Sequence, residues 1–264
     1  MAFNKPLVNM FIVIVLVCIS ACTTADTESG VITAQDVIGR EQPSEWDLVI
    51  LGDSDMWLSY EYYVPLFEQD LGIPIHVHDK TAPPNSPPAI ELRGDQELQN
   101  LVSEADIVIF NIPFVGPAVG GACFDQNRSF EEAECFDVSL NEYSQWTLDM
   151  FTEIKELVGS EGVMIRLQNM FIPLRYWQRN LYLEKRLDTC LECFSAYWDA
   201  QAEISEAEGI PLVDVFTLFH GPDGDQDPYA LGYFDSDPIH VNDEGAKAIA
   251  ELYRSVGYEY WLPK

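Results

Sequence analysis

Basic residues are scarce in this 264-residue sequence, which holds 14 lysines and arginines against 44 aspartates and glutamates. The formal net charge is therefore −30 at pH 7. A surface this acidic repels nucleic acids and anionic lipid headgroups, so we expect no nucleic-acid partner. Histidine is rarer still, with four residues in the chain, which leaves few candidates for a general base.

Long hydrophobic runs are also missing, apart from one apolar stretch that follows Lys5 near the amino terminus. This stretch, MFIVIVLVCIS, is too short to span a membrane comfortably and is typical of the apolar region of a signal peptide. It ends in Ile19-Ser20-Ala21-Cys22, which resembles a bacterial lipobox with Cys22 as the residue that receives the lipid. An ordinary cleaved signal and an uncleaved anchor are the alternatives.

This pattern predicts an exported, cell-envelope lipoprotein that contacts the membrane through its lipid anchor only. We expect a signal peptide over residues 1–21 and a lipidated, flexible tether over residues 22–43, where the sequence is polar and weakly patterned. The remaining residues, 44–264, then form a single folded domain.

Cysteine is infrequent too, and two of the six cysteines, Cys18 and Cys22, belong to the targeting segment. The remaining four are Cys123, Cys135, Cys190 and Cys193. In an exported protein we expect two disulfides, most simply 123–135 and 190–193, although four cysteines allow three pairings. A zinc site and a redox-active pair are the alternatives, because Cys190-x-x-Cys193 has the spacing of both.

Short apolar runs alternate with longer amphipathic segments from Trp46 onward. We predict strands over residues 47–51, 73–77, 107–112, 163–167 and 212–216, and helices over 56–71, 89–104, 140–158, 176–208 and 243–256. This alternation indicates an α/β fold, a flavodoxin-like three-layer α/β/α sandwich around a parallel five-stranded sheet. The second strand places His76 and His78 on one face, and irregular chain is expected over 82–88 and 113–138.

Two polar motifs flank this pattern. Gly52-Asp53-Ser54 follows the first strand, and Asp237-Pro-Ile-His240 precedes the last helix, with Asn242 as its expected cap. In a parallel sheet both positions fall at the carboxyl edge, where ligands bind. A serine hydroxyl becomes a nucleophile when a histidine takes its proton, and an acid orients that histidine. A simple turn and a surface histidine are the alternatives.

Taken together, these motifs resemble the SGNH (GDSL-type) hydrolase family over residues 44–260. The resemblance implies a serine esterase that forms an acyl-enzyme, with Ser54 as nucleophile, His240 as base and Asp237 as the orienting acid. The substrate would be a small-molecule, glycan or lipid ester, and no cofactor or metal is expected. The α/β-hydrolase elbow G-x-S-x-G does not fit, because position 56 is Met56.

The chain departs from this family at the oxyanion hole, for which the resemblance implies three donors. The N–H of Ser54 is the first. Instead of a glycine, the segment after the second strand reads APPNSPP, where Asn85 is a candidate donor. Instead of the family's asparagine, the segment after the third strand has Val115, and Asn111 is the candidate there. The alternative function is therefore a catalytically impaired, SGNH-like binding lipoprotein.

Overall fold

The computed structural model divides the chain into residues 1–31 and residues 32–264. All of the residues that it describes belong to the second unit. They are 44–53, 56, 59–81, 88–112, 133–159, 162–171, 187–224, 226–235 and 240–261. For residues 88–90, 133–139 and 187–195 only the backbone is described.

Five strands form one parallel sheet in the order β2-β1-β3-β4-β5. The strands are β1 (Trp46–Gly52), β2 (Ile75–Thr81), β3 (Ile107–Phe110), β4 (Met164–Gln168) and β5 (Leu212–Val213). The predicted three-layer sandwich with a flavodoxin-like sheet is confirmed. β3 and β4 are buried along their whole length, as expected of strands that helices cover on both faces.

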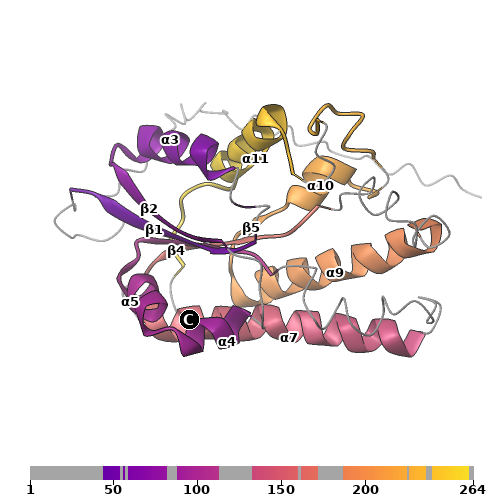
Figure 1. Cartoon of the computed structure of the whole chain (residues 1–264), viewed down its shortest axis with the longest axis horizontal. Coiled ribbons are helices and arrows are strands. Elements are labelled where there is room, and N and C mark those ends of the chain that lie inside the picture. Colours follow the sequence, from indigo (N-terminus) through magenta and orange to yellow (C-terminus); the bar gives the residue numbers. More distant parts are fainter. Residues whose placement is uncertain are drawn as a thin grey trace, which may run out of the picture. The chain divides into compact units, whose positions relative to one another are not determined.

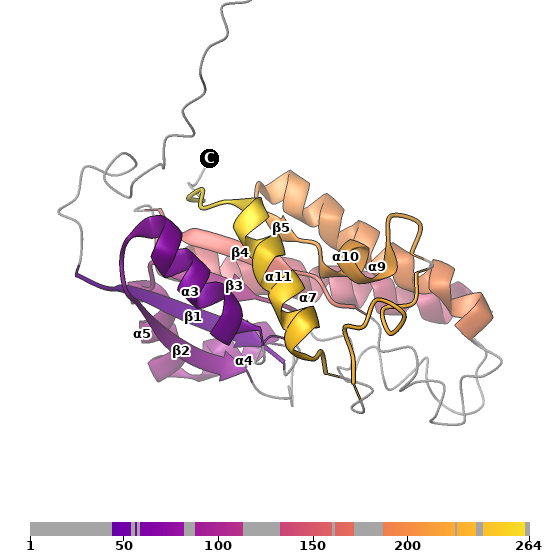
Figure 2. The same cartoon turned by 90° about the horizontal axis from the view of Figure 1, so that it is seen from above.

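Helices cover both faces of this sheet (Figure 1). One face carries α3 (Tyr60–Leu71), α10 (Val215–His220) and α11 (Asp243–Val256). The other carries α4 (Pro88–Gly94), α5 (Gln96–Glu104), α7 (Ala133–Val158) and α9 (Leu187–Glu208). Figure 2 shows α3 and α11 side by side, and the two helices are in contact. Within the described residues, no helix combines the length and the apolar character needed to cross a membrane.

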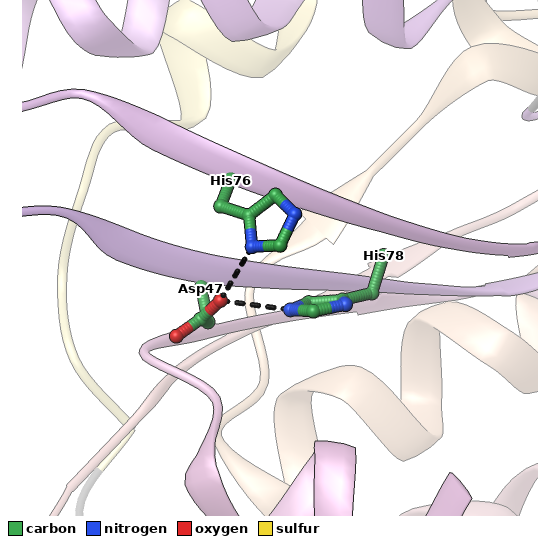
Figure 3. A group of neighbouring side chains, drawn as sticks. All are labelled: Asp47, His76 and His78. Atoms are coloured by element: carbon green, nitrogen blue, oxygen red, sulfur yellow. Dashed lines mark hydrogen bonds and ion pairs between the residues drawn. The ribbon is translucent and has the colours of Figure 1, made fainter.

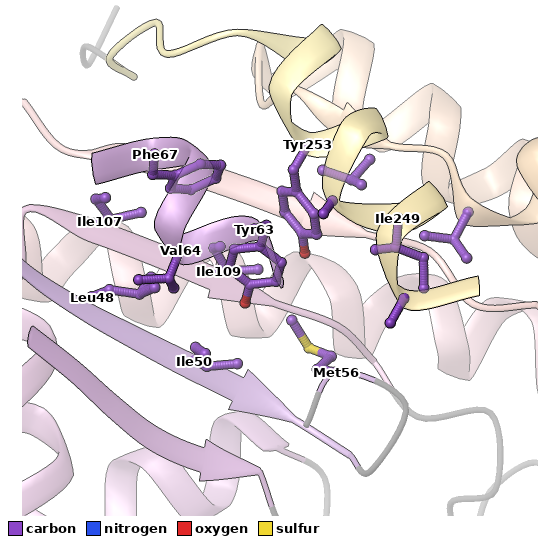
Figure 4. Packing of buried hydrophobic residues seen from close by; sticks show 14 of the residues in the cluster. Leu48, Ile50, Met56, Tyr63, Val64, Phe67, Ile107, Ile109, Ile249 and Tyr253 are labelled. Atoms are coloured by element: carbon purple, nitrogen blue, oxygen red, sulfur yellow. The ribbon is translucent and has the colours of Figure 1, made fainter. Parts of the chain in front are cut away.

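Two buried clusters lie on the two faces, because successive strand residues point to opposite sides. Val49 and Leu51 of β1 belong to the cluster under α7 and α9, whereas Leu48 and Ile50 belong to the cluster under α3 and α11. Figure 4 shows the second cluster, in which the rings of Tyr63 and Tyr253 lie 4.4 Å apart between their centroids. These contacts bind α3 and α11 to one sheet.

The edge strands differ from the predicted bounds. The second strand was expected over 73–77, but β2 runs from Ile75 to Thr81. As the outermost strand it tolerates polar residues, and His76 and Asp79 are exposed, so hydrophobicity does not mark where it ends. The last strand was expected over 212–216, but β5 stops at Val213 and α10 follows.

The predicted helices also need corrections. The segment expected as one helix over 89–104 is divided into α4 and α5 at Asp95, whose side chain accepts hydrogen bonds from Glu97 N and Leu98 N. The second helix correction concerns α7, which begins at Ala133, within the stretch predicted to be irregular. The helix α11, by contrast, has the predicted bounds and the predicted cap, Asn242.

His220 is a core side chain in α10. It is fully buried, its ring lies 4.9 Å from the ring of Phe216, and Nδ1 lies 3.2 Å from the carbonyl oxygen of Gln226. Burial lowers the pKa of His220 to about 4, although the hydrogen bond to Gln226 and the charge of Asp227 act in the opposite direction. The ring is therefore neutral at pH 7 and packs as an uncharged side chain.

This burial predicts a pH-dependent stability. The unfolded chain binds the His220 proton near pH 6.5 and the folded chain only near pH 4, so protonation favours unfolding between these values. The stability that the folded chain gains by keeping His220 neutral is fully present above pH 6.5. It is lost as the pH falls to 4, and it amounts to about 3 kcal/mol of the free energy of unfolding. Urea titrations at pH 7 and at pH 4 give the free energy of unfolding at each pH. The decrease from pH 7 to pH 4 should be smaller for His220→Gln than for the wild type. Phe171→Leu, which removes ring contacts to Phe219 and Phe234 and no proton site, should keep the wild-type pH dependence. An equal loss in His220→Gln would contradict this account.

Candidate active site

The turn after β1 is held by an asparagine from the neighbouring strand. Asn111, which follows β3, accepts a hydrogen bond from the backbone N–H of Asp53 through Oδ1 at 3.1 Å. Its Nδ2 donates to Asp53 Oδ1 at 3.0 Å, and its own backbone N–H donates to Leu51 O at 3.0 Å. Asn111 is fully buried and Asp53 is 8% exposed. The residue before Ser54 is therefore fixed from both its backbone and its side chain.

Gly52 is required by this contact. A Cβ atom at position 52 would lie 2.0 Å from Asn111 Oδ1 and 2.6 Å from Met56 Sδ. Real Cβ contacts do not reach such distances, so any side chain would displace the asparagine that holds Asp53. The glycine of the Gly-Asp-Ser motif thus has a structural reason in this chain: it lets the backbone of β1 pass directly against Asn111.

Met56 secures the other end of the turn. Its backbone N–H donates to Asp53 O at 3.2 Å, so the residues on either side of positions 54 and 55 are tied together. The Met56 side chain is fully buried in the cluster that also contains Val241 and Ala246. Figure 4 shows it just beyond the end of β1, on the face of the sheet that α11 covers.

Tyr143 of α7 supports the same edge from the opposite face. Its hydroxyl donates a hydrogen bond to Ile112 O at 3.1 Å, next to Asn111 in the chain. Burial raises the pKa of Tyr143, and the charge of Asp53 raises it further. The phenol therefore stays protonated and keeps its donor role.

A second asparagine makes the same kind of paired hydrogen bonds between the ends of β4 and β5. Asn169 follows β4, and its Nδ2 donates to Asp214 Oδ1 at 2.7 Å. Its Oδ1 accepts from the backbone N–H of Phe216 at 3.0 Å. The carboxylate of Asp214 also caps α10 by accepting from Thr217 N. Neither asparagine was expected in this role, although a lone Asn follows each apolar strand in the sequence, in FNI and QNM.

The loop over residues 226–235 is tied to the start of α11 by Asn242. The Asn242 Oδ1 accepts from the backbone N–H groups of Glu244 and Gly245, which caps α11. Its Nδ2 donates to Gly232 O at 2.8 Å and to Asp235 Oδ1 at 3.1 Å. One side chain thus binds the start of the helix to the chain on the far side of positions 236–239.

Aromatic rings anchor this loop to the sheet. Phe234 lies 5.2 Å from Phe171, which follows β4, and 4.6 Å from Tyr229, measured between ring centroids. Phe171 also packs against Phe219 of α10 at 4.9 Å. Such ring pairs add about 0.5–1.5 kcal/mol each to the area that they bury. The chain over residues 229–235 is therefore held both by hydrogen bonds and by packing.

Several predicted site residues lie outside the described part of the chain, so their roles stay predictions. These residues are Cys22, Ser54, Asn85, Cys123 and Asp237. Cys135 lies on α7 rather than in irregular chain, and Cys190 and Cys193 lie on α9. The pairing of these cysteines, and the expected domain division at residues 21 and 43, likewise remain predictions.

Comparisons with known proteins concern the fold. No protein-family model and no curated protein matches the sequence. The solved structure of the lipase Lip_vut3 from a goat rumen metagenome matches with a TM-score of 0.64 at 15% identity, over 81% of this chain and 98% of the lipase. A DUF4886 family protein from Bacteroides uniformis matches with a TM-score of 0.50 at 10% identity, over 80% of this chain and 82% of that protein. At these identities the likeness shows a shared fold.

Asn111→Ala should destabilise the chain and also loosen the turn before Ser54. The substitution removes the two hydrogen bonds that Asn111 makes to the Asp53 N–H and carboxylate, and we expect the free energy of unfolding to fall by about 1–3 kcal/mol. Asn169→Ala removes the equivalent bonds at the other side of the sheet and is the matched control. Urea titration should give similar losses for both variants, whereas modification of Ser54 by a serine-reactive probe should slow in Asn111→Ala only. Equal labelling rates would show that the turn does not depend on Asn111.

Asn242→Asp should separate the two tasks of this side chain. An aspartate caps a helix as well as an asparagine does, but it has no N–H to donate and it faces Asp235. We expect a loss of about 1 kcal/mol in the free energy of unfolding, and about 2 kcal/mol for Asn242→Ala, which also removes the cap. Urea titration gives both values. If Asn242→Asp were as stable as the wild type, the bonds to Gly232 and Asp235 would contribute nothing.

Proposed function

We propose that this chain is a serine ester hydrolase whose nucleophile is Ser54. The observation that carries the proposal is the paired hydrogen bond between Asn111 and Asp53, which fixes the residue before Ser54 at the carboxyl edge of a parallel sheet. A nucleophile has to be held in place before it reacts, because orientation supplies much of the rate of such reactions. The bonds on both sides of position 54 supply such a support.

In the proposed reaction His240 takes the proton of the Ser54 hydroxyl as the serine oxygen attacks the ester carbonyl carbon. Asp237 orients the imidazole and stabilises its charged form. The protonated His240 then gives its proton to the leaving alcohol, and an acyl-enzyme remains. Water attacks that ester, His240 accepts its proton and returns it to Ser54, and the acid product leaves.

The oxyanion would be held by the backbone N–H of Ser54 and by the candidate donors Asn85 and Asn111. The amide of Asn111 has two N–H donors, and its bond to Asp53 uses one of them. A contribution to the oxyanion hole is therefore compatible with its hold on the turn. One such donor is worth about 2.7–4 kcal/mol of transition-state stabilisation.

The fold supports this proposal, since a lipase adopts it over 98% of its own length. We place the substrate among small-molecule, glycan or lipid esters. We further propose that the chain is exported and held at the cell envelope by a lipid on Cys22, with the acidic domain facing solvent. A soluble domain on such an anchor would reach esters of the surrounding envelope without entering the membrane.

A binding lipoprotein without turnover is the second candidate. The shortage of donors for an oxyanion hole favours this candidate. The segment after β2 offers no glycine, and one N–H of the Asn111 carboxamide is already bonded to Asp53. In this case the carboxyl edge of the sheet would still bind an ester or a related ligand, but Ser54 would not be acylated.

A fluorophosphonate probe distinguishes the two candidates, because it reacts with a serine only where a base and an oxyanion hole act together. We expect mass spectrometry of the full-length chain, purified in detergent, to find the adduct on Ser54. Ser54→Ala and His240→Ala should remove it, and both variants should keep the wild-type circular dichroism spectrum.

A folded wild-type chain without adduct, and without turnover of aryl acetate or butyrate esters, would reject the hydrolase and leave the binding protein. An adduct that persists in His240→Ala would reject His240 as the base.

A further inference from the structure

A second polar cluster lies at the opposite end of β1 from the Gly-Asp-Ser turn. Asp47 of β1 and His76 and His78 of β2 each direct one side-chain atom to the same place, and these atoms all lie within 4.8 Å of one another (Figure 3). Among the described residues, this is the only group of three or more histidine, cysteine or acidic side chains that is arranged in this way.

The pairing of β1 and β2 brings these side chains together. Asp47 is in register with His76, and His78 lies two residues further along the same face of the edge strand. His76 Nδ1 lies 3.2 Å and His78 Nε2 lies 2.7 Å from one and the same oxygen, Asp47 Oδ1. The two imidazole rings are 4.4 Å apart between centroids. Two imidazoles thus converge on a single carboxylate oxygen.

The backbone holds Asp47 in this position. Its N–H donates to Asp106 Oδ2 at 3.0 Å, and its carbonyl oxygen accepts from the N–H of Asp106 at 3.0 Å. The carboxylate of Asp106 also adds negative charge next to the cluster. The nearest cation along the same face of β2, Lys80, is paired with Glu97 at 3.8 Å. The cluster is therefore fixed by the sheet and lies in acidic surroundings.

We propose that Asp47, His76 and His78 form a binding site for a divalent transition metal ion of the zinc class. Imidazole nitrogen and carboxylate oxygen are ligands that zinc accepts, and three protein ligands with one open position are a common arrangement. Metal–ligand bonds of 2.0–2.1 Å in a tetrahedron separate neighbouring ligand atoms by roughly 3.3 Å. The 3.2 Å separation of His76 Nδ1 and Asp47 Oδ1 meets this value, and the 2.7 Å separation at His78 needs a small rotation of the ring.

Exposure of the cluster leaves a path for the ion. The side chains of His76, Asp47 and His78 are 58%, 43% and 20% exposed, so water can complete the coordination. Without an ion, exposed pairs of this kind contribute about 0–1 kcal/mol to stability. With an ion, the site would cross-link the edge strand β2 to β1, and the net charge of −30 would raise the local concentration of cations.

The test is calorimetric titration of Zn²⁺ alone into the full-length chain purified in detergent, followed by Co²⁺ absorption spectroscopy. We expect one ion per chain with a micromolar or lower Kd and the visible bands of tetrahedral Co²⁺. His76→Gln, His78→Gln and Asp47→Asn should each weaken Zn²⁺ binding at least tenfold. The matched controls are Asp79→Asn, an exposed acid on the same strand, and His240→Gln, and both should bind as the wild type does.

Binding that survives His76→Gln and His78→Gln, or binding only at millimolar Zn²⁺, would overturn the proposal. Loss of binding in His240→Gln would also overturn it, because the ion would then lie at the candidate active site. The fluorophosphonate adduct on Ser54 serves as a separate readout. His76→Gln and His78→Gln should leave it unchanged, so failure of the metal site and failure of the hydrolase are distinguishable.

Discussion

The paired hydrogen bonds between Asn111 and Asp53 meet a requirement that every parallel sheet imposes at its carboxyl edge. The central strands β3 and β4 enter this edge fully buried, and the polar backbone and side-chain groups that follow them have to find partners inside the protein. Asn111 satisfies two groups of Asp53 with one carboxamide, at 3.1 and 3.0 Å. Gly52 lacks a side chain because this carboxamide occupies the space. The position of residue 54 in the candidate site therefore depends on an asparagine that is not a member of the proposed triad.

The same solution recurs around the edge. Asn169 binds Asp214 and the start of α10, and Asn242 binds the start of α11 to the chain before His240. In each case a short amide side chain offers an acceptor and a donor at once, which no carboxylate or hydroxyl does in the same geometry. Asn111 and Asn169 thus connect elements that are 58 and 45 residues apart in the sequence, and Asn242 closes a shorter connection before α11.

Much of the fold was predictable, because buried parallel strands are continuous apolar runs and their helices are amphipathic. The prediction was most accurate for α11, where Asn242 and Gly257 mark both ends in the sequence. The prediction was wrong for the two edge strands. β2 carries His76, Asp79 and Lys80 because an edge strand is exposed to solvent. Val215 and Phe216 belong to a helix, although their apolar side chains are typical of a strand. In these places tertiary position, rather than local propensity, decides the structure.

The candidate site was only partly predictable. Its motifs are short stretches of sequence, but the side chains that hold them in place come from distant parts of the chain. Gly-Asp-Ser and Asp-x-x-His are visible as short patterns, whereas the partner of Asp53 lies 58 residues away and becomes apparent only through the pairing of β1 with β3. The cluster of Asp47, His76 and His78 has the same origin: the alternation of β2 aligns the histidines, but the register supplies the acid. Gly52 lies five positions after Asp47 in β1, roughly 17 Å along a strand. One strand thus carries a polar cluster at each end, and an ion at Asp47 would reinforce the sheet edge without reaching the chemistry proposed at Ser54.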